Sequence, residues 1–144
     1  MAKKTIKLKK YVDIVNEYDA GGAITPGMLV TLASDGDVDK NGAAGVACEK
    51  MFALEDELQG KTIDDAYATG APVQCWTAVP GEEVLAWLKD GEDVAVGDVL
   101  TSAGAGKLKA KGITDIAIAV ALEAVDMSGS AGADPSGRIA VRIL

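Results

Sequence analysis

Histidine is missing from this chain of 144 residues, and aromatic side chains make up only 4% of it. The absence of histidine removes the commonest general base, the usual nitrogen ligand of zinc and every catalytic triad that contains histidine. With few aromatic residues, Ala, Val, Ile, Leu and Gly must build the core, and such small and β-branched side chains suit closely packed sheets. We therefore expect a β-rich protein without catalytic residues, metal ligands or a cofactor, and not an enzyme.

Cysteine is also scarce, because the chain has only Cys48 and Cys75. The two residues are far apart in the sequence and form no CxxC motif, which redox and zinc sites commonly use. We expect both to be buried, reduced thiols, with a disulfide or a reactive thiol as the alternative.

Long apolar runs are absent as well. The longest, from Ile116 to Leu122, has seven residues, whereas a helix needs about 20 to cross a bilayer. The first residues, MAKKTIKLKK, have a charged start with no apolar stretch behind it, unlike a secretory signal peptide. These features predict a soluble protein that is made in the cytoplasm and has no membrane partner.

The first ten residues contain no acidic side chain but hold five of the 14 basic ones. The net charge is −8 overall, so the rest of the chain, with nine basic and 22 acidic residues, carries −13. An acidic body repels the phosphates of nucleic acid, which argues against a nucleic-acid partner.

From Lys4 to Val15 apolar and cationic residues alternate, which predicts an extended segment with a lysine-rich face. Two interpretations remain open. The segment can be an edge strand whose lysines discourage aggregation. Alternatively, it can be an arm that leaves the body and adds a strand to a partner.

An internal repeat organises the remainder of the chain. With an offset of 70 residues, PGMLVTLASDGDVDKNG (residues 26–42) aligns with VGDVLTSAGAGKLKAKG (residues 96–112), and three of the identical positions are glycines. The two segments predict similar hairpin units, at residues 24–54 and 94–125, within one body that spans residues 16–144. In this alignment Gly45 to Ala47 corresponds to the region from Ile118 to Ala121.

The hairpin loops contain two motifs that bear superficial likeness to ligand sites. Asp37, Asp39 and Asn41 match the opening of a calcium-binding loop, but the closing glutamate is displaced, since Cys48 stands at the twelfth position. GAGK at residues 104–107 lacks the spacing of a phosphate-binding loop. Because neither motif is retained in the other copy, both are expected to be plain hairpin turns.

The remaining patterns predict a mainly β fold: a compact β-sandwich or barrel-like (β-tulip-like) body with one short helix and an extended N-terminal arm at residues 1–15. Strands are expected at residues 28–33, 45–54, 72–79 and 138–144, with a turn at 16–23 and a low-complexity loop at 128–137. The short helix is expected from Thr62 to Gly70, where Thr62 is a candidate N-cap and Gly70 a stop signal.

Several stretches resemble one family of viral proteins in order and spacing. They are LQGKTIDDAYATGAPV (58–73), PGEEV (80–84), VAVGDVLTSAGAGKL (94–108), ALEAVDMSG (121–129) and RIAVRIL (138–144). Together they resemble the capsid decoration, or cement, proteins of tailed bacteriophages, a group akin to the lambda head decoration protein.

This resemblance implies a structural virion protein on the outer surface of a phage head. It would bind the major capsid protein, bridge its subunits and stabilise the capsid. It would also associate with itself, as a homotrimer or alternatively a dimer. Attachment is expected through the N-terminal arm, at Lys3, Lys4, Thr5, Ile6, Lys7, Leu8, Lys9, Lys10, Tyr11 and Val12.

Two other functions remain to be compared with the structure. The first is a β-rich carbohydrate- or ligand-binding module, in which Trp76 and Trp87 would form stacking surfaces. The second is an enzyme with similar VGDVL hairpins, although its sequence would need clustered polar groups where this chain has scattered carboxylates.

Overall fold

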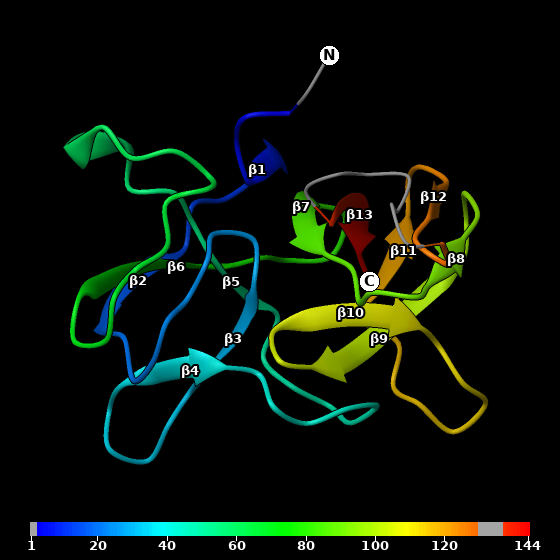
Figure 1. Cartoon of the computed structure of the whole chain (residues 1–144), viewed down its shortest axis with the longest axis horizontal. Helices are drawn as coiled ribbons and strands as arrows, with labels where there is room; N and C mark the ends of the chain where they lie inside the picture. The colour runs from blue at the N-terminus through cyan, green and yellow to red at the C-terminus, as the bar shows by residue number, and fades with distance from the viewer. Residues whose placement is uncertain (1–2, 130–136) are drawn as a thin grey trace.

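The computed structural model describes residues 3–129 and 137–144, so most of the predicted loop at 128–137 lies outside the described residues. The fold is mainly β, as predicted, with two antiparallel sheets that lie side by side (Figure 1). One 3₁₀ turn, η1 (Glu57–Gln59), is the helical element among the described residues.

The first sheet has five strands in the order β2-β6-β5-β3-β4. Their bounds are β2 (Val15–Asp19), β3 (Leu29–Leu32), β4 (Val38–Lys40), β5 (Met51–Ala53) and β6 (Pro72–Thr77). A parallel bridge between Ala20 and Val38 connects the two ends of the sheet, so that it curls into a partly closed barrel.

The second sheet has six strands in the order β1-β7-β13-β11-β9-β10. Their bounds are β1 (Lys7–Lys9), β7 (Glu83–Trp87), β9 (Val99–Gly104), β10 (Lys107–Ala110), β11 (Ala119–Ala121) and β13 (Arg138–Ile143). A short ribbon of β8 (Asp93–Val94) and β12 (Val125–Asp126) lies beside it. The bridge between Leu88, which follows β7, and Leu108 of β10 closes the five strands from β7 to β10, and β1 is added outside this closure.

The two hairpins at the centre of the sequence repeat have the same register. In β3–β4 Val30 pairs with Lys40 and Leu32 with Val38. In β9–β10 the residues 70 positions later are paired in the same way: Leu100 with Ala110 and Ser102 with Leu108. The shared turn residues of the two segments therefore encode one hairpin geometry twice.

The structural repeat extends well beyond these hairpins. The strands β2, β3, β4, β5 and β6 occupy the same positions in the first sheet as β7, β9, β10, β11 and β13 in the second. We call residues 14–79 the first repeat and residues 82–144 the second repeat. Among the described strands, β1 and the short ribbon of β8 and β12 have no counterpart in the first repeat.

The register also corrects the predicted alignment after the hairpin. Val30 pairs with Met51, and its counterpart Leu100 pairs with Ala119. Met51–Ala53, and not Gly45 to Ala47, therefore corresponds to Ala119–Ala121. A longer loop in the first repeat caused the error, because sequence identity ends at Gly42 and Gly112.

Both repeats have the same interior positions. The first barrel is filled by a cluster of small and aliphatic residues that includes Ala20, Val30, Val38, Val73 and Cys75. Their counterparts are buried too: Leu88, Leu100, Leu108, Ile139 and Val141. Burial of such side chains, at about 25 cal/mol per Å² of apolar surface, is the main force that holds each barrel together.

Two sequence-based expectations for local structure were wrong. No helix forms from Thr62 to Gly70: this stretch contains a turn, and Tyr67 forms a bridge with Ile24. The Asp65 carboxylate accepts hydrogen bonds from the backbone and hydroxyl of Thr62, so the expected capping residues close a tight turn. Residues 16–19 of the predicted turn at 16–23 belong to strand β2 (Val15–Asp19), because β6 pairs with this strand along its full length.

Candidate functional site

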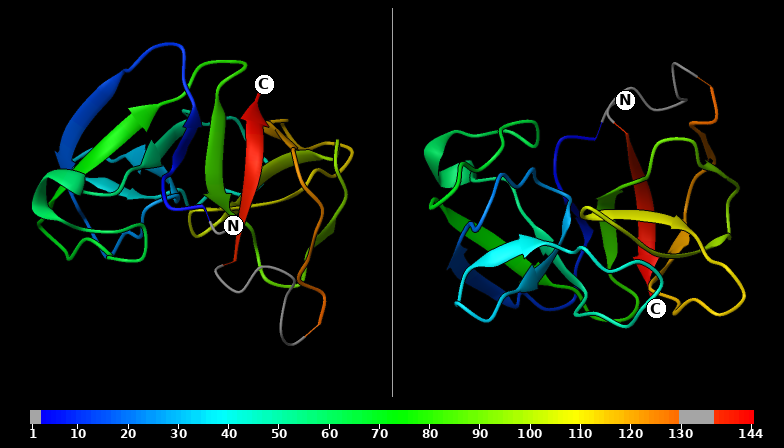
Figure 2. Two further views of the ribbon diagram at one scale, coloured as in Figure 1. Left: turned by 90° about the horizontal axis from the view of Figure 1, so that it is seen from above. Right: turned by 60° about the horizontal axis from the view of Figure 1, so that its bottom comes forward.

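The N-terminal segment, residues 3–12, lies on the second sheet as its edge strand (Figures 1 and 2). Lys7 pairs with Val84 and Lys9 with Glu83, and the backbone N–H of Leu85 donates to the carbonyl of Ile6 at 2.9 Å. Ile6 is fully buried in the main core, and Leu8 packs against the same cluster. In the single chain the N-terminal segment is therefore an edge strand, which is one of the two arrangements that the sequence left open.

Two carboxylates fasten this segment to the body. Glu55 accepts hydrogen bonds from the hydroxyl of Thr5 at 2.7 Å and from the backbone N–H of Ile6 at 3.3 Å. Glu82, which is fully buried, accepts from the backbone N–H groups of Tyr11 at 2.7 Å and Val12 at 3.3 Å. Hydrogen bonds to carboxylates therefore hold the segment on both sides of β1.

The lysines remain at the surface, where several have acidic or aromatic partners. Lys7 and Lys10 both contact Asp13, and these hydrogen bonds, the one from Lys10 first, hold the pKa of its carboxyl below the usual value. The ammonium group of Lys7 also lies 5.6 Å from the centre of the Trp76 ring.

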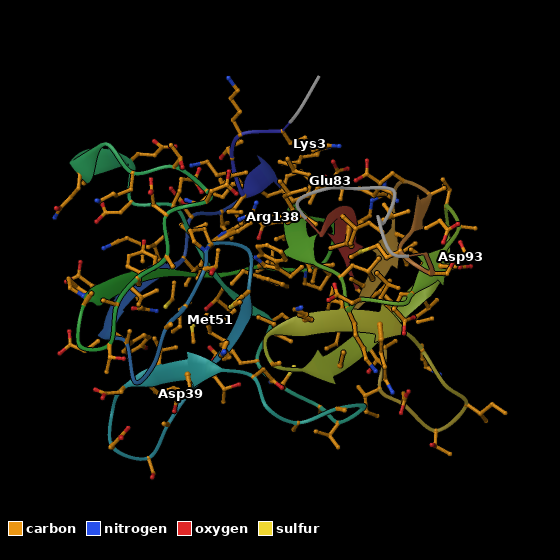
Figure 3. The ribbon with its side chains drawn as sticks, in the orientation of Figure 1. Lys3, Asp39, Met51, Glu83, Asp93 and Arg138 are labelled. Carbon is orange, nitrogen blue, oxygen red and sulfur yellow. The ribbon has the colours of Figure 1, made fainter. Side chains whose placement is uncertain are left out.

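Tyr11 and the remaining lysines of the segment are exposed as well. Lys9 lies 5.7 Å from the ring of Tyr11, a side chain that is 63% exposed. Lys3 (Figure 3) pairs with Glu123 at 2.9 Å. Lys4 is also exposed. The segment thus presents a cationic face that can meet an acidic surface.

A groove of about 330 Å³ lies between the N-terminal segment and η1. Its lining includes Lys7, Lys10 and Val15 together with Glu55 and Glu57. Charges of both signs face this space, so an extended chain with mixed charge is a chemically suitable occupant.

The tryptophans do not form the stacking platform that a carbohydrate-binding module would need. Trp76 has no exposed surface. Trp87 is half-buried, donates from its indole nitrogen to the carbonyl of Pro26 at 2.9 Å, and lies 4.4 Å from the guanidinium of Arg138. Both rings are therefore part of the packing between elements.

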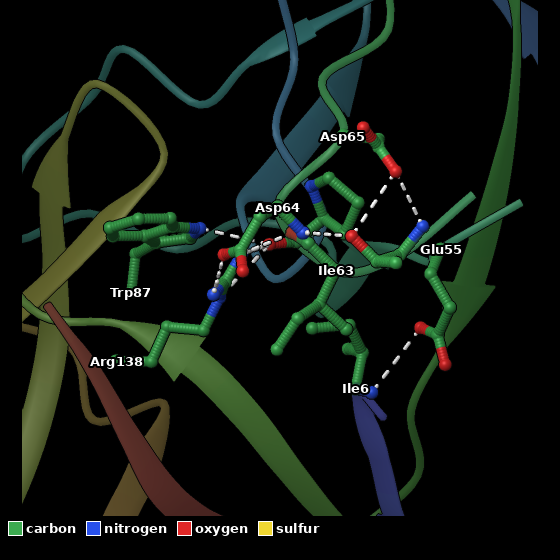
Figure 4. A network of polar contacts seen from close by, with 9 residues as sticks. Ile6, Glu55, Ile63, Asp64, Asp65, Trp87 and Arg138 are labelled. Carbon is green, nitrogen blue, oxygen red and sulfur yellow. Dashed lines mark hydrogen bonds and ion pairs between the residues drawn. The ribbon is translucent and has the colours of Figure 1, made fainter. Parts of the chain in front are cut away.

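Sequence reasoning missed a buried arginine that connects the two repeats. Arg138 is fully buried, stacks on Trp87 and pairs with Asp64 at 3.0 Å (Figure 4). Its guanidinium also donates to the carbonyls of Pro26 and Ile63. A basic residue at the start of a strand gave no sign of this role, since all of its partners are distant in sequence.

Both cysteines are free, with Cys75 buried and Cys48 half-buried. Burial raises the pKa of the Cys75 thiol to about 12 and also raises the pKa of Cys48. The thiolate form, which reacts, is therefore suppressed at both residues.

No group of three or more His, Cys, Asp and Glu side chains is close enough to hold a metal ion in the described part of the chain. The predicted hairpin at Asp37 is present, and the backbone N–H of this residue donates to Asp35. Over residues 3–129 and 137–144, no helix is long and apolar enough to cross a membrane.

Fold and surface together define an all-β protein with an internal repeat, whose lysine-rich edge strand is fastened by buried carboxylates. Its structure is similar to the crystal structure of the N-terminal base of head fiber gp8.5 from bacteriophage phi29. The TM-score is 0.60 at 12% sequence identity, over 92% of this chain and 95% of that one. At this identity the similarity demonstrates a shared fold. No family model and no curated protein matches the chain.

Proposed function

We propose that this protein is a structural component of a phage head, attached to the outside of the capsid. The observation that carries the proposal is the shared fold with the phi29 head fiber base, which spans almost the whole of both chains. The stretches that resemble capsid decoration proteins support the same location independently. In this role the chain has no catalytic function.

We further propose that the protein binds the major capsid protein through its N-terminal segment and bridges neighbouring subunits. The exposed side chains of Lys4 and Lys9 support this contact, because they offer cations to an acidic capsid surface. Many copies on one shell would add their modest affinities through multivalency. A trimer is the assembly that the resemblance to decoration proteins favours.

Because Ile6 is part of the core, the segment must be tested by substitutions at its surface and not by deletion. Deleting residues 3–10 would remove the buried Ile6 and so damage the fold itself. Reversing two surface charges, Lys4→Glu together with Lys9→Glu, leaves Ile6 and the strand ladder in place. The matched control is Lys40→Glu, an exposed lysine of β4 in the other sheet.

Purified heads of the candidate phage, stripped of their own copies, are mixed with each protein and sedimented. We expect wild type and Lys40→Glu to sediment with the heads, and occupancy by the double variant to fall about tenfold, since opposed charges become like charges. Equal occupancy for all three proteins would contradict the role of the segment. Failure of the wild type to bind heads would contradict the function.

A further inference from the structure

The outer face of the second repeat is the exposed counterpart of a face that is buried in the first. In the first repeat Leu29, Phe52 and Trp76 are fully buried on this face. By strand register their counterparts are Val99, Val120 and Arg142. Val99 is 36% exposed, Val120 is half-buried and Arg142 is exposed. One position in the fold is thus covered in one repeat and open in the other.

Strands β7 and β1 cover the face of the first repeat, and the turn at Gly27 shows how closely. A Cβ added to Gly27 would lie 2.8 Å from the carbonyl oxygen of Leu85 and 3.2 Å from the Cδ1 atom of Ile6. The backbone N–H of Trp87 donates to the carbonyl of Gly27 at 3.3 Å, and its indole nitrogen donates to Pro26 at 2.9 Å.

The corresponding turn of the second repeat has the same backbone but no neighbour. Gly97 has a φ of 91°, against 93° at Gly27. Within the described residues, nothing lies within 4 Å of a Cβ added there. The site that β7 occupies at Gly27 is therefore open at Gly97.

The strand that corresponds to β7 is β2, and its outer edge is open. The backbone N–H of Ala20 donates to Ala71 and that of Thr77 to Ile14. Bonded pairs alternate along antiparallel strands, so the N–H groups of Val15, Glu17 and Asp19 point away from β6. In the described part of the chain these three groups have no hydrogen-bond acceptor.

The open face and the open edge are complementary and lie at opposite ends of the molecule (Figure 1). On the face, Val96 is 66% exposed and Leu144 is 42% exposed. Val99 and Leu144 line a shallow hollow together with Lys111 and with Asp98, whose carboxylate accepts a hydrogen bond from the backbone N–H of Ala95. The edge carries the acidic side chains of Glu17 and Asp19, both exposed. An exposed apolar patch with a charged rim is typical of a protein interface.

We propose that a second copy of this chain docks the edge of its β2 on the outer face of the second repeat, around Val96, Gly97 and Val99. In this contact the Asp19 N–H of one copy donates to the Gly97 carbonyl of the other, as Trp87 donates to Gly27 within the chain. The contact is head-to-tail, so successive copies close into a ring or continue as a filament. Direct pairing of two β2 edges is disfavoured, because it brings the acidic side chains of both copies together.

Cross-linking distinguishes this contact from a two-fold one. Asp19 and Val96 are the counterparts of Trp87 and Pro26, which are in contact. In a Cys48→Ser background, Asp19→Cys and Val96→Cys are made as separate proteins and oxidised alone and mixed. A disulfide dimer is expected only in the mixture. Dimers formed by either variant alone, or none in the mixture, would overturn the proposal.

Sedimentation velocity tests the same contact without added cysteines. Val96→Glu places a carboxylate next to Asp19 of the neighbouring copy, so we expect self-association to weaken about tenfold. Adding Asp19→Lys should restore it. The control is Val46→Glu, at a valine that is 48% exposed elsewhere. Circular dichroism verifies that each variant is folded. A monomeric wild type, or equal effects of both glutamates, would refute the head-to-tail contact.

Discussion

At the scale of single residues, buried polar side chains matter most for the stability of the fold. The Glu82 carboxylate has no exposed surface and accepts three backbone hydrogen bonds, from Tyr11, Val12 and Val79. One carboxylate therefore fixes both the PGEEV turn and the end of the N-terminal segment.

Replacing Glu82 by alanine should destabilise the protein strongly. Three backbone donors lose their acceptor, and a buried donor without a partner costs about 1–3 kcal/mol, with water replacing part of the loss near Tyr11. We expect the free energy of unfolding, measured by urea denaturation, to fall by about 2–4 kcal/mol.

The control is the neighbouring Glu83→Ala. That side chain pairs with Arg142 at 3.7 Å near the surface, so its loss should cost about 0.5 kcal/mol. If the free energy of unfolding falls by similar amounts in the two variants, the hydrogen bonds of Glu82 do not contribute the stability expected of them. Amide exchange at Tyr11 and Val12 should also accelerate in Glu82→Ala alone.

At the scale of elements, the two repeats provide matched sites in one molecule. Gly27 and Gly97 lie in equivalent turns, two residues before β3 and β9, and have nearly the same positive φ, so a side chain meets the same backbone strain at both. Their surroundings differ, because the carbonyl of Leu85 lies against Gly27 while Gly97 is open.

Alanine substitutions at these two positions should separate the cost of backbone strain from the cost of a steric clash with neighbouring residues. Gly97→Ala should lower the free energy of unfolding by about 1 kcal/mol, the cost of a left-handed residue with a Cβ. Gly27→Ala should cost about 2 kcal/mol more, since β7 and Ile6 must move.

Thermal and urea unfolding measure the free energy of unfolding of each variant. The protein concentration is kept low so that contacts between copies at Gly97 do not contribute. If the two variants are equally stable, the close contact of β7 with Gly27 is not as rigid as the distance of 2.8 Å indicates.

At the scale of the whole molecule, the two repeats share one core although each has its own barrel. The main cluster of buried residues includes Leu29, Phe52 and Trp76 from the first repeat together with Leu85 and Ile139 from the second. Arg138 adds hydrogen bonds across the same boundary. Neither repeat can unfold without exposing apolar surface of the other.

We therefore expect a single cooperative unfolding transition. Trp76 lies in the first repeat and Trp87 in the second, so a Trp87→Phe variant reports on the first repeat by fluorescence, while circular dichroism reports on both. The two urea curves should coincide, as in two-state unfolding. Two separated midpoints would show that the repeats are independent folding units.

How far the sequence alone leads differs between these scales. Turn glycines and alternating apolar residues predicted the β fold, the hairpins at 26–42 and 96–112 and the strand at 138–144, because these signals are local. The helix expected from Thr62 to Gly70 was wrong for the same reason: a capping pattern says nothing about the bridge between Tyr67 and Ile24. The sequence did not reveal the full length of the repeat. Beyond Gly42 and Gly112 the two segments are no longer identical, but their strands still pair in the same register.

For the N-terminal segment, the sequence by itself determined the composition: a lysine-rich, alternating strand without acidic residues. Only the tertiary structure decided where it lies, on β7 with Ile6 buried and Glu55 and Glu82 holding its ends. The physical reason is that side-chain alternation specifies an extended backbone but not its partner. Which edge a strand joins depends on where distant residues leave hydrogen-bonding groups unpaired and apolar surface exposed.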